Sequence, residues 1–248
     1  MKIINIISIS DGNKKDLKKT IDSVKNQNFK KYRHFIIAKK LEKKFLKKNK
    51  SNKIKFIVGK DSSIYNAMNI GEKLTYNNFT IYLNSGDVFF SNNSLRIINN
   101  KIKNNLNGQF VTVLKYKNIL FFPKKKFFFD KNTFTHSSFV RSPVKKNDIV
   151  FYDEDYLITA DGNWMKENIK KNGLKRIYLP ISIFSLDGVS TFPSLKTIIM
   201  KKNLDIKGLT KEVIKFIISK FTSRRFFYKL IYSTKYNYKY EKIYRKPW

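Results

Sequence analysis

Short apolar segments rich in β-branched residues recur along the first ninety residues and are separated by segments with helical periodicity. In 14–27 and in the later part of 61–74, apolar residues fall three and four positions apart, which is typical of helices with one buried face. Buried strands are predicted for 2–10, 32–38, 54–58 and 79–84. This alternation predicts an α/β half-domain.

The remainder of the chain mixes both patterns. We expect a helix capped by Ser94, extended aromatic chain over 110–129, a helix within 155–171 and a strand over 177–185. From Leu195 onward the pattern indicates two helices and a tail rich in Tyr and Lys.

Charge narrows the classes of partner without choosing among them. The 248 residues contain 52 Lys and Arg against 18 Asp and Glu, a formal net charge of +34. Such a field attracts nucleic acid, anionic lipid or phosphate-bearing ligands. Part of it follows from the abundance of residues that AT-rich codons encode, and the lysines of 39–50 are typical of a solvated helix face. Cysteine is absent, which excludes disulfide-stapled scaffolds and thiolate metal sites.

Neither a secretory signal nor a membrane span is visible in the sequence. The apolar segment Ile3–Ile9 is short, is interrupted by Asn5 and Ser8, and has no small-residue cleavage site after it. No segment approaches the roughly 18 uninterrupted apolar residues of a membrane span. We therefore expect a cytoplasmic protein, attached at most peripherally to a membrane face.

One carboxylate follows a predicted strand at a position where open α/β sheets bind ligands. Asp87 comes after the strand 79–84 across the turn Ser85-Gly86. Ligands of such sheets bind outside the carboxyl ends of the strands, and an aspartate oxygen there could hold a divalent cation against a diphosphate. Taken alone, Ser-Gly-Asp describes a plain turn equally well.

The segment Asp61-Ser-Ser-Ile-Tyr-Asn-Ala-Met-Asn-Ile-Gly71 joins a polar loop to a helix with two small residues, Ala67 and Gly71. Small residues allow close approach of two backbones. Ordinary packing of a helix on a sheet accounts for them equally well. It leaves three polar residues unexplained, namely Asp61, Asn66 and Asn69.

These motifs resemble the nucleotide-sugar-binding half of family 2 glycosyltransferases of the GT-A type, in the subgroup that builds bacterial surface polysaccharides. Several members carry Asp-Lys-Gly-Ile-Tyr-Asp-Ala-Met-Asn-Lys-Gly followed by Leu-Asn-Ser-Gly-Asp. The matching segments here are 8–28, Asp61–Gly71, Tyr82–Asp87, His136–Phe139, Tyr152–Glu154, Ile158–Asp161 and Ile181–Ser190. The likeness covers roughly residues 1–190.

The resemblance implies a Rossmann-like mixed sheet flanked by helices, and an inverting transfer of a hexose from a nucleotide sugar to an acceptor hydroxyl. A base must take the hydroxyl proton, and a cation must stabilise the departing diphosphate. Asp161 matches the base and Asp87 the metal ligand, with Mg²⁺ or Mn²⁺ as cofactor. Residues that match donor contacts, the donor being UDP-linked, are Ser10, Asp11, Asp61, Asn69 and Asp87.

Three assignments leave alternatives open: the role of His136, the identity of the base, and the recognition of the nucleoside. His136 is assigned to the acceptor or the diphosphate, with local hydrogen bonding as the alternative. Asp153 and Glu154 compete with Asp161 as base, although acids before a helix can equally cap it. Family members carry an Asp-Gly-Gly-Ser-like stretch where this chain has Ala38-Lys39, so nucleoside recognition is expected to be altered.

The resemblance also suggests how the chain is divided. We expect a glycosyltransferase domain over 1–192, with a nucleotide-sugar-binding half (1–90) and an acceptor half (91–192). A basic, aromatic, helical extension follows over 193–248.

The C-terminal extension carries a pattern of its own. Apolar residues of 213–221 precede Arg224 and Arg225, which is typical of a helix at a membrane interface. Packing on the catalytic domain is the alternative. Docking on an anionic membrane surface, at the cytosolic face of the inner membrane, would bring the enzyme to the lipid-linked glycan acceptor that the resemblance suggests.

Two other functions compete with the transferase. The charge also suits a nucleic-acid-binding protein, but no recognised binding motif is present and a polyanion-binding surface would avoid the acids described above. The loss of the nucleoside motif at Ala38-Lys39 also suits a glycosyltransferase-like domain without catalysis.

Overall fold

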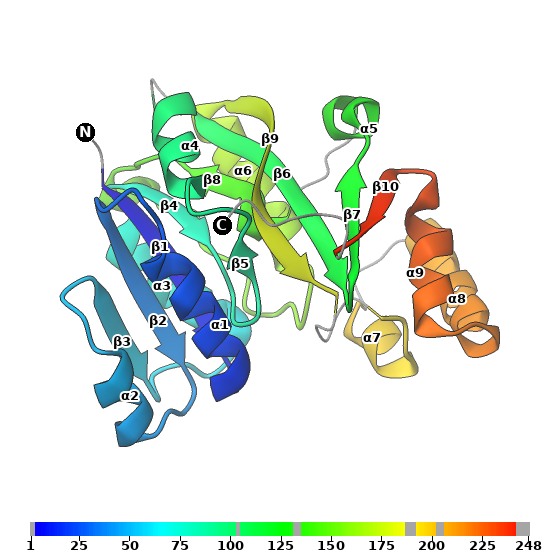
Figure 1. Ribbon diagram of the computed structural model, residues 1–248, viewed down its shortest axis with the longest axis horizontal. Coiled ribbons are helices and arrows are strands. Elements are labelled where there is room, and N and C mark those ends of the chain that lie inside the picture. Colours follow the sequence, from blue (N-terminus) through cyan, green and yellow to red (C-terminus); the bar gives the residue numbers. More distant parts are fainter. Residues whose placement is uncertain (1–2, 103–104, 131–134, 187–191, 202–205, 242–248) are drawn as a thin grey trace.

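One mixed sheet organises the molecule. The computed structural model describes residues 3–102, 105–130, 135–186, 192–201 and 206–241, so the motif residues 187–190 lie outside the described part. Within it ten strands follow the order β10-β7-β6-β8-β4-β1-β2-β3, with β9 paired to β6 and β5 paired to β9. Figure 1 shows helices on both sides of the sheet.

The N-terminal half is the predicted alternation of strands and helices. Its strands are β1 (Ile4–Ser10), β2 (Tyr32–Ala38), β3 (Ile54–Val58) and β4 (Phe79–Tyr82), and its helices are α1 (Lys14–Lys25), α2 (Lys43–Asn49) and α3 (Ile64–Thr75). The four strands are parallel, in the order β3-β2-β1-β4. Asn13 starts α1 by accepting hydrogen bonds from the backbone N–H groups of Lys15 and Asp16.

The second half adds mainly antiparallel pairs. Its elements are β5 (Val88–Phe89), α4 (Ser94–Lys101), β6 (Asn107–Tyr116), β7 (Ile119–Pro123), α5 (Lys125–Asp130), η1 (His136–Ser138), β8 (Phe139–Arg141), η2 (Lys146–Asp148), α6 (Ala160–Asn172) and β9 (Leu174–Ser185). Strand β8 lies antiparallel between β4 and β6. An antiparallel strand beside β4 starts at the edge where β4 ends, which brings η1 to that edge.

Three details differ from the sequence-based expectation. Residues 125–130 are helical, not extended, because Pro123 ends β7 and the following helix buries Phe128. The N-cap of α4 is Asn93, and the Ser94 hydroxyl instead accepts a hydrogen bond from the Ser91 N–H at 3.1 Å. Helix α6 begins at Ala160, five residues later than the start of the predicted segment.

The C-terminal residues contain more structure than expected. Three helices, α7 (Leu195–Met200), α8 (Ile206–Phe221) and α9 (Arg224–Ser233), precede strand β10 (Tyr236–Tyr240). This strand pairs antiparallel with β7. The division at residue 192 stays a prediction, and the segment that follows it contributes a strand to the same sheet.

Strand β1 is buried along its whole length because both of its faces are covered by helices. Ile4 and Ile6 lie in a cluster with residues of α1 and α4, whereas Ile7 and Ile9 lie in a cluster with residues of α3 and α6. Both faces of the strand are therefore covered. On the α3 side a Cβ on Gly71 would come within 2.8 Å of Ile7 Cδ1, so a larger residue would force the buried Ile7 side chain to shift.

A buried ion pair ties α3 to β8. Arg141 Nε lies 2.8 Å from Glu72 Oε2, and both side chains are completely buried. The Tyr82 hydroxyl donates to Glu72 Oε1 at 2.7 Å, while Arg141 donates to the Thr75 carbonyl and the Thr80 hydroxyl. Burial raises the pKa of Glu72, and the positive charge of Arg141 opposes that rise.

We expect Glu72→Gln to lower the free energy of unfolding by about 3–5 kcal/mol, because it leaves the Arg141 charge buried without its counterion. Urea denaturation measures the loss. The control is Glu167→Gln, which removes an exposed ion pair with Lys170 and should cost less than about 1 kcal/mol. Equal, small losses for both variants would contradict this role of the pair.

Candidate functional site

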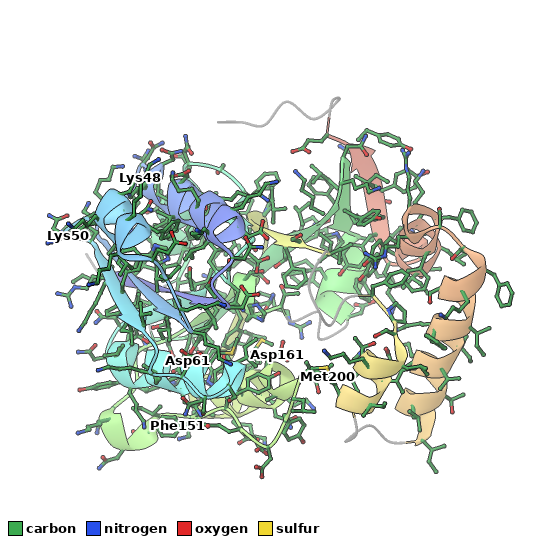
Figure 2. The ribbon with its side chains drawn as sticks, turned by 90° about the horizontal axis from the view of Figure 1, so that it is seen from below. Lys48, Lys50, Asp61, Phe151, Asp161 and Met200 are labelled. Atoms are coloured by element: carbon green, nitrogen blue, oxygen red, sulfur yellow. The ribbon has the colours of Figure 1, made fainter. Side chains whose placement is uncertain are left out.

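The site lies at the edge of the sheet where β1 and β4 end. After β4 the chain makes the turn Asn84–Asp87, in which Gly86 has a φ of 98°, a conformation that favours glycine. Thr20 of α1 holds this turn, since its hydroxyl accepts from the Gly86 N–H at 3.0 Å and donates to the Asp87 carbonyl at 2.8 Å. Figure 2 looks onto this edge from below.

The Asp87 carboxylate is buried and only half satisfied. Its Oδ1 accepts from the Ser185 N–H, at the end of β9, at 3.2 Å. Its Oδ2 is buried without a hydrogen-bond partner among the described residues. Burial raises the pKa of Asp87 to about 7, although His136 and the Ser185 N–H both oppose the rise.

His136 lies between the two carboxylates that the sequence singled out. Its Nε2 is 3.1 Å from the Asn84 amide nitrogen and 3.9 Å from Asp87 Oδ2, and its Nδ1 is 3.6 Å from Asp161 Oδ2. An amide nitrogen only donates, so Nε2 of the neutral ring accepts this hydrogen bond. The ring proton then lies on Nδ1, facing Asp161. Burial alone would lower the pKa of His136, but the carboxylates of Asp161 and Asp87 outweigh it and raise the pKa.

Asp161 lies in the first turn of α6 and is partly open to solvent, with 31% of its side chain exposed. Burial would raise its pKa, but the interaction with His136 and the backbone N–H of Gly162 lower it overall. The Asp161 carboxylate is therefore ionised at neutral pH. The preceding residue, Thr159, has a φ of 78°, which is strained for a β-branched residue.

A stack of aromatic rings fixes the start of α6. Tyr65 of α3 stacks on Tyr152, and Tyr152 stacks on Trp164 of α6, with centroids 5.7 and 4.8 Å apart. The Tyr65 hydroxyl accepts from the Ala160 N–H at 3.0 Å, and the Trp164 ring N–H donates to the Val150 carbonyl. The position of Asp161 thus depends on α3 as well as on its own helix.

Three of the residues expected to contact the donor lie at a strand end or in a loop: Ser10, Asp11 and Asp61. Ser10, at the end of β1, accepts from the Gly12 N–H, and the exposed Asp11 accepts from the Asn13 N–H. Asp61 precedes α3 and has a buried Oδ1 without a hydrogen-bond partner among the described residues. Asp61 and Asp161 are both labelled in the view onto the site edge in Figure 2.

Asn69 belongs to a different structural unit. Its amide accepts from the Tyr152 N–H at 2.7 Å and donates to the Tyr152 carbonyl and to Glu154. Asn66 also donates to Glu154. These bonds fix the loop before α6, so both asparagines and Glu154 have a structural explanation that the sequence alone did not reveal.

A divalent cation fits Asp87 as its single protein carboxylate. Among the described residues no group of three His, Cys, Asp or Glu side chains could enclose a metal ion. Mg²⁺ is commonly held by one or two carboxylates together with water and substrate phosphates. The unpartnered Oδ2 of Asp87 suits that arrangement.

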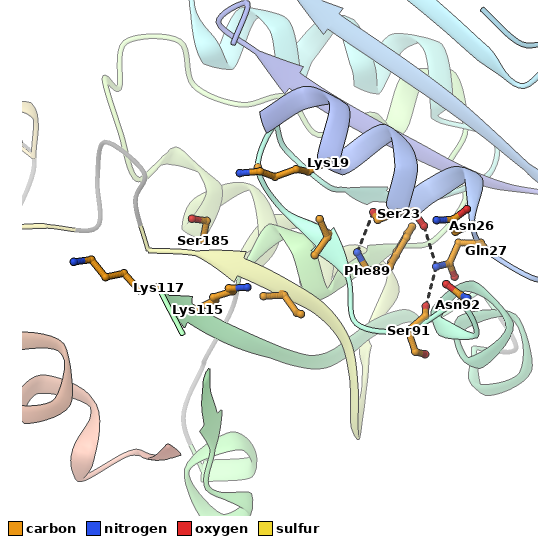
Figure 3. A pocket seen from close by; sticks show the side chains of 13 residues that line it. Lys19, Ser23, Asn26, Gln27, Phe89, Ser91, Asn92, Lys115, Lys117 and Ser185 are labelled. Atoms are coloured by element: carbon orange, nitrogen blue, oxygen red, sulfur yellow. Dashed lines mark hydrogen bonds between the residues drawn. The ribbon is translucent and has the colours of Figure 1, made fainter. Parts of the chain in front are cut away.

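A cavity of about 740 Å³ adjoins Asp87 from the α1 side, lined by Gly86 and Ser185 among others. Figure 3 shows lysines toward one end, including Lys19 and Lys115, and amides such as Asn92 toward the other. Lys19 is paired with Asp16, and Lys115 is paired with Glu241. The volume lies within the range of about 300–1,000 Å³ that small-molecule sites occupy.

Comparison with known proteins defines the fold. No family model and no curated protein sequence matches the chain. The structure of TarS 1–349 from S. aureus in complex with UDP-GlcNAc matches with a TM-score of 0.62 and 12% identity, over 88% of this chain and 72% of that one. The chain has a GT-A-like glycosyltransferase fold. This confirms the predicted fold class, including the mixed sheet flanked by helices.

A second neighbour shares this fold. The mannosyltransferase PcManGT from Pyrobaculum calidifontis, in complex with GDP-Man and Mn²⁺, has a TM-score of 0.57 and 9% identity. The match covers 87% of this chain and 64% of that one. A longer TarS structure is matched over only 44% of its length. At these identities the likeness concerns the fold alone.

The sequence reasoning missed two residues that shape the site. Thr20 holds the Asn84–Asp87 turn, and Ser185 supplies the N–H that binds Asp87. Thr20 is a polar residue on the otherwise apolar inner side of α1, and that exception is the signal that could have identified it.

We expect Asp87→Asn to raise the free energy of unfolding at pH 8 by about 1–4 kcal/mol. The folded-state pKa of about 7 exceeds the unfolded value, so the stability of the wild type falls as pH rises from about 4 to about 7. Asparagine keeps the acceptor for Ser185 and carries no charge. Urea denaturation at pH 8 and pH 4 measures the gain, which should be nearly lost at pH 4, and a variant less stable than wild type at pH 8 would contradict the prediction.

Proposed function

We propose that this protein is an inverting, metal-dependent glycosyltransferase. It transfers a sugar from a UDP-linked donor to a lipid-linked glycan acceptor, as in bacterial surface polysaccharide synthesis, at the cytoplasmic face of the inner membrane. The observation that carries the proposal is the position of His136 between an ionised Asp161 and a buried Asp87 with an unpartnered oxygen. The nucleotide-sugar complexes of TarS and PcManGT give it further support.

We assign donor binding to residues at the carboxyl ends of the strands and in the loops that follow them. Ser10, Asp11 and Asp61 are placed at its nucleoside, and Asp87 Oδ2 at a Mg²⁺ or Mn²⁺ ion on its diphosphate. Such an ion stabilises the negative charge that develops on the leaving diphosphate. His136, whose pKa the two carboxylates raise, adds a positive charge near the same place when it is protonated.

Asp161 is assigned the role of base. The acceptor hydroxyl attacks the anomeric carbon, the bond from that carbon to the diphosphate oxygen breaks, and the hydroxyl proton passes to the Asp161 carboxylate. Its lowered pKa keeps it unprotonated at neutral pH, and its partial exposure leaves it accessible. The aromatic stack of Tyr65, Tyr152 and Trp164 keeps the carboxylate in position.

The test begins with binding. Thermal unfolding is followed with UDP, GDP and other nucleoside diphosphates, each with Mg²⁺, with Mn²⁺ or with EDTA. We expect UDP with a cation to raise the melting temperature, because a ligand that binds only the folded state stabilises it. Asp87→Asn should abolish the part of the shift that depends on the cation, whereas Asp161→Asn should retain it.

Turnover tests the assigned roles. Release of UDP from UDP-sugars should fall by about 10²–10⁴-fold in Asp161→Asn, which loses the base, and should be lost in Asp87→Asn. Glu167→Gln, a neutralised acid on the exposed side of the same helix, should retain wild-type turnover. Turnover that survives both aspartate substitutions would remove the assignment. Tight, salt-resistant binding of DNA without any response to nucleotides would favour a nucleic-acid-binding protein instead.

A further inference from the structure

The long helix α8 exposes an apolar stripe, which we call the α8 face. Ile206 and Phe221, at the two ends of the helix, are 86% and 85% exposed, and four residues between them are 38–52% exposed: Leu209, Val213, Ile214 and Ile217. Most of these positions recur every three or four residues, so they share one side of the helix. At 1.5 Å per residue, the stripe is about 24 Å long.

An ordinary surface helix turns its apolar side to the core, whereas most apolar side chains of α8 are exposed. Glu212 is buried on the inner side of α8 and is bound by Lys201 and Lys215 at 2.7 and 2.5 Å, while Ile218 packs against the apolar cluster around Phe227. These pairs, with Lys201 coming from the end of α7, hold the acidic side of the helix against the protein. The apolar side is consequently left facing outward, where a contiguous patch marks an interaction site.

Cations surround the α8 face. Residues 206–241 contain nine Lys and Arg against two acids, Glu212 and Glu241, and both acids are paired with lysines. Lys211, Lys220, Arg224 and Arg225 are exposed. Arg224 and Arg225 also lie over the rings of Phe192 and Tyr240, which limits their motion.

We propose that the α8 face docks the protein on an anionic phospholipid surface. A partly exposed apolar helix flanked by cations is the arrangement that lies in the interface of such a membrane, and each cation near the surface adds about 1 kcal/mol. A second copy of the chain would bring two sets of these cations together, and their repulsion disfavours it. Among the described residues, no helix combines the length and apolarity needed to cross a bilayer.

A second cavity, of about 300 Å³, lies on the inner side of α8. It is lined by Glu212 of α8, Tyr232 of α9, Phe184 of β9 and Thr135. Phe184 meets the His136 ring edge to face, with centroids 6.0 Å apart, and Thr135 directly precedes His136. This part of the inference rests on the proposed function: docking by α8 brings the lipid-linked acceptor to the side of the protein where His136 lies.

Vesicle binding tests the docking, with the full chain and no nucleotide. Cosedimentation is measured with vesicles of phosphatidylcholine alone and with 30% phosphatidylglycerol. We expect binding to the anionic vesicles only. Ile217→Gln with Phe221→Gln should weaken it by about tenfold or more, because two apolar side chains no longer enter the interface. The control is Leu157→Gln with Phe129→Gln, which also replaces one exposed aliphatic and one exposed aromatic residue outside α8 and should bind as the wild type does.

Three results would overturn the docking surface. Equal binding of the α8 variant and the wild type would mean that net charge alone attracts the vesicles. Equal loss in the control variant would mean that the effect is not specific to α8. A wild-type dimer in light scattering that the α8 variant disrupts, without a change in vesicle binding, would assign the face to a second copy. Circular dichroism verifies that each variant is folded. The UDP thermal shift, measured separately, tests the proposed transferase and does not depend on vesicle binding.

Discussion

The ion pair between Glu72 and Arg141 determines where the second half of the sheet meets the first. Arg141 is the last residue of β8. Its guanidinium contacts Glu72 within α3, Thr75 at the end of α3 and Thr80 in β4. With β8 fixed antiparallel to β4, the residues just before β8 must lie at the carboxyl end of β4. That is why His136, fifty residues away along the chain, lies beside Asn84 and Asp87.

Different surroundings give three titratable groups of the site different states. Asp87 is buried with one N–H donor, so burial dominates and its pKa rises. Asp161 is also affected by burial, but His136 and an N–H at the start of a helix outweigh it. The two carboxylates in turn raise the pKa of His136. Two aspartates that look alike in the sequence thereby have pKa values shifted in opposite directions.

Much of the N-terminal half could be predicted from the sequence because β1, β2 and β4 are almost entirely buried and consist mainly of apolar residues. Strand β10 could not be recognised as easily: Tyr236, Tyr238 and Tyr240 alternate with polar residues, and this pattern is convincing only once β7 is seen to offer a free edge. The positions of Asp87 and Asp161 relative to His136 depend on long-range packing. Asn69 shows that a motif can also mislead: its position in the motif suggested a donor contact, but its amide binds the backbone of Tyr152.

The pairing of β10 with β7 changes how the C-terminal region can be regarded. Its residues 236–240 satisfy the outer N–H and C=O groups of Ile119–Pro123, and Tyr228 donates to the Leu186 carbonyl from within the same region. A chain shortened before α7 would leave β7 as a bare, apolar sheet edge, which is a template for pairing between molecules. By covering that edge, the region protects the sheet against such pairing and belongs to the same folded unit.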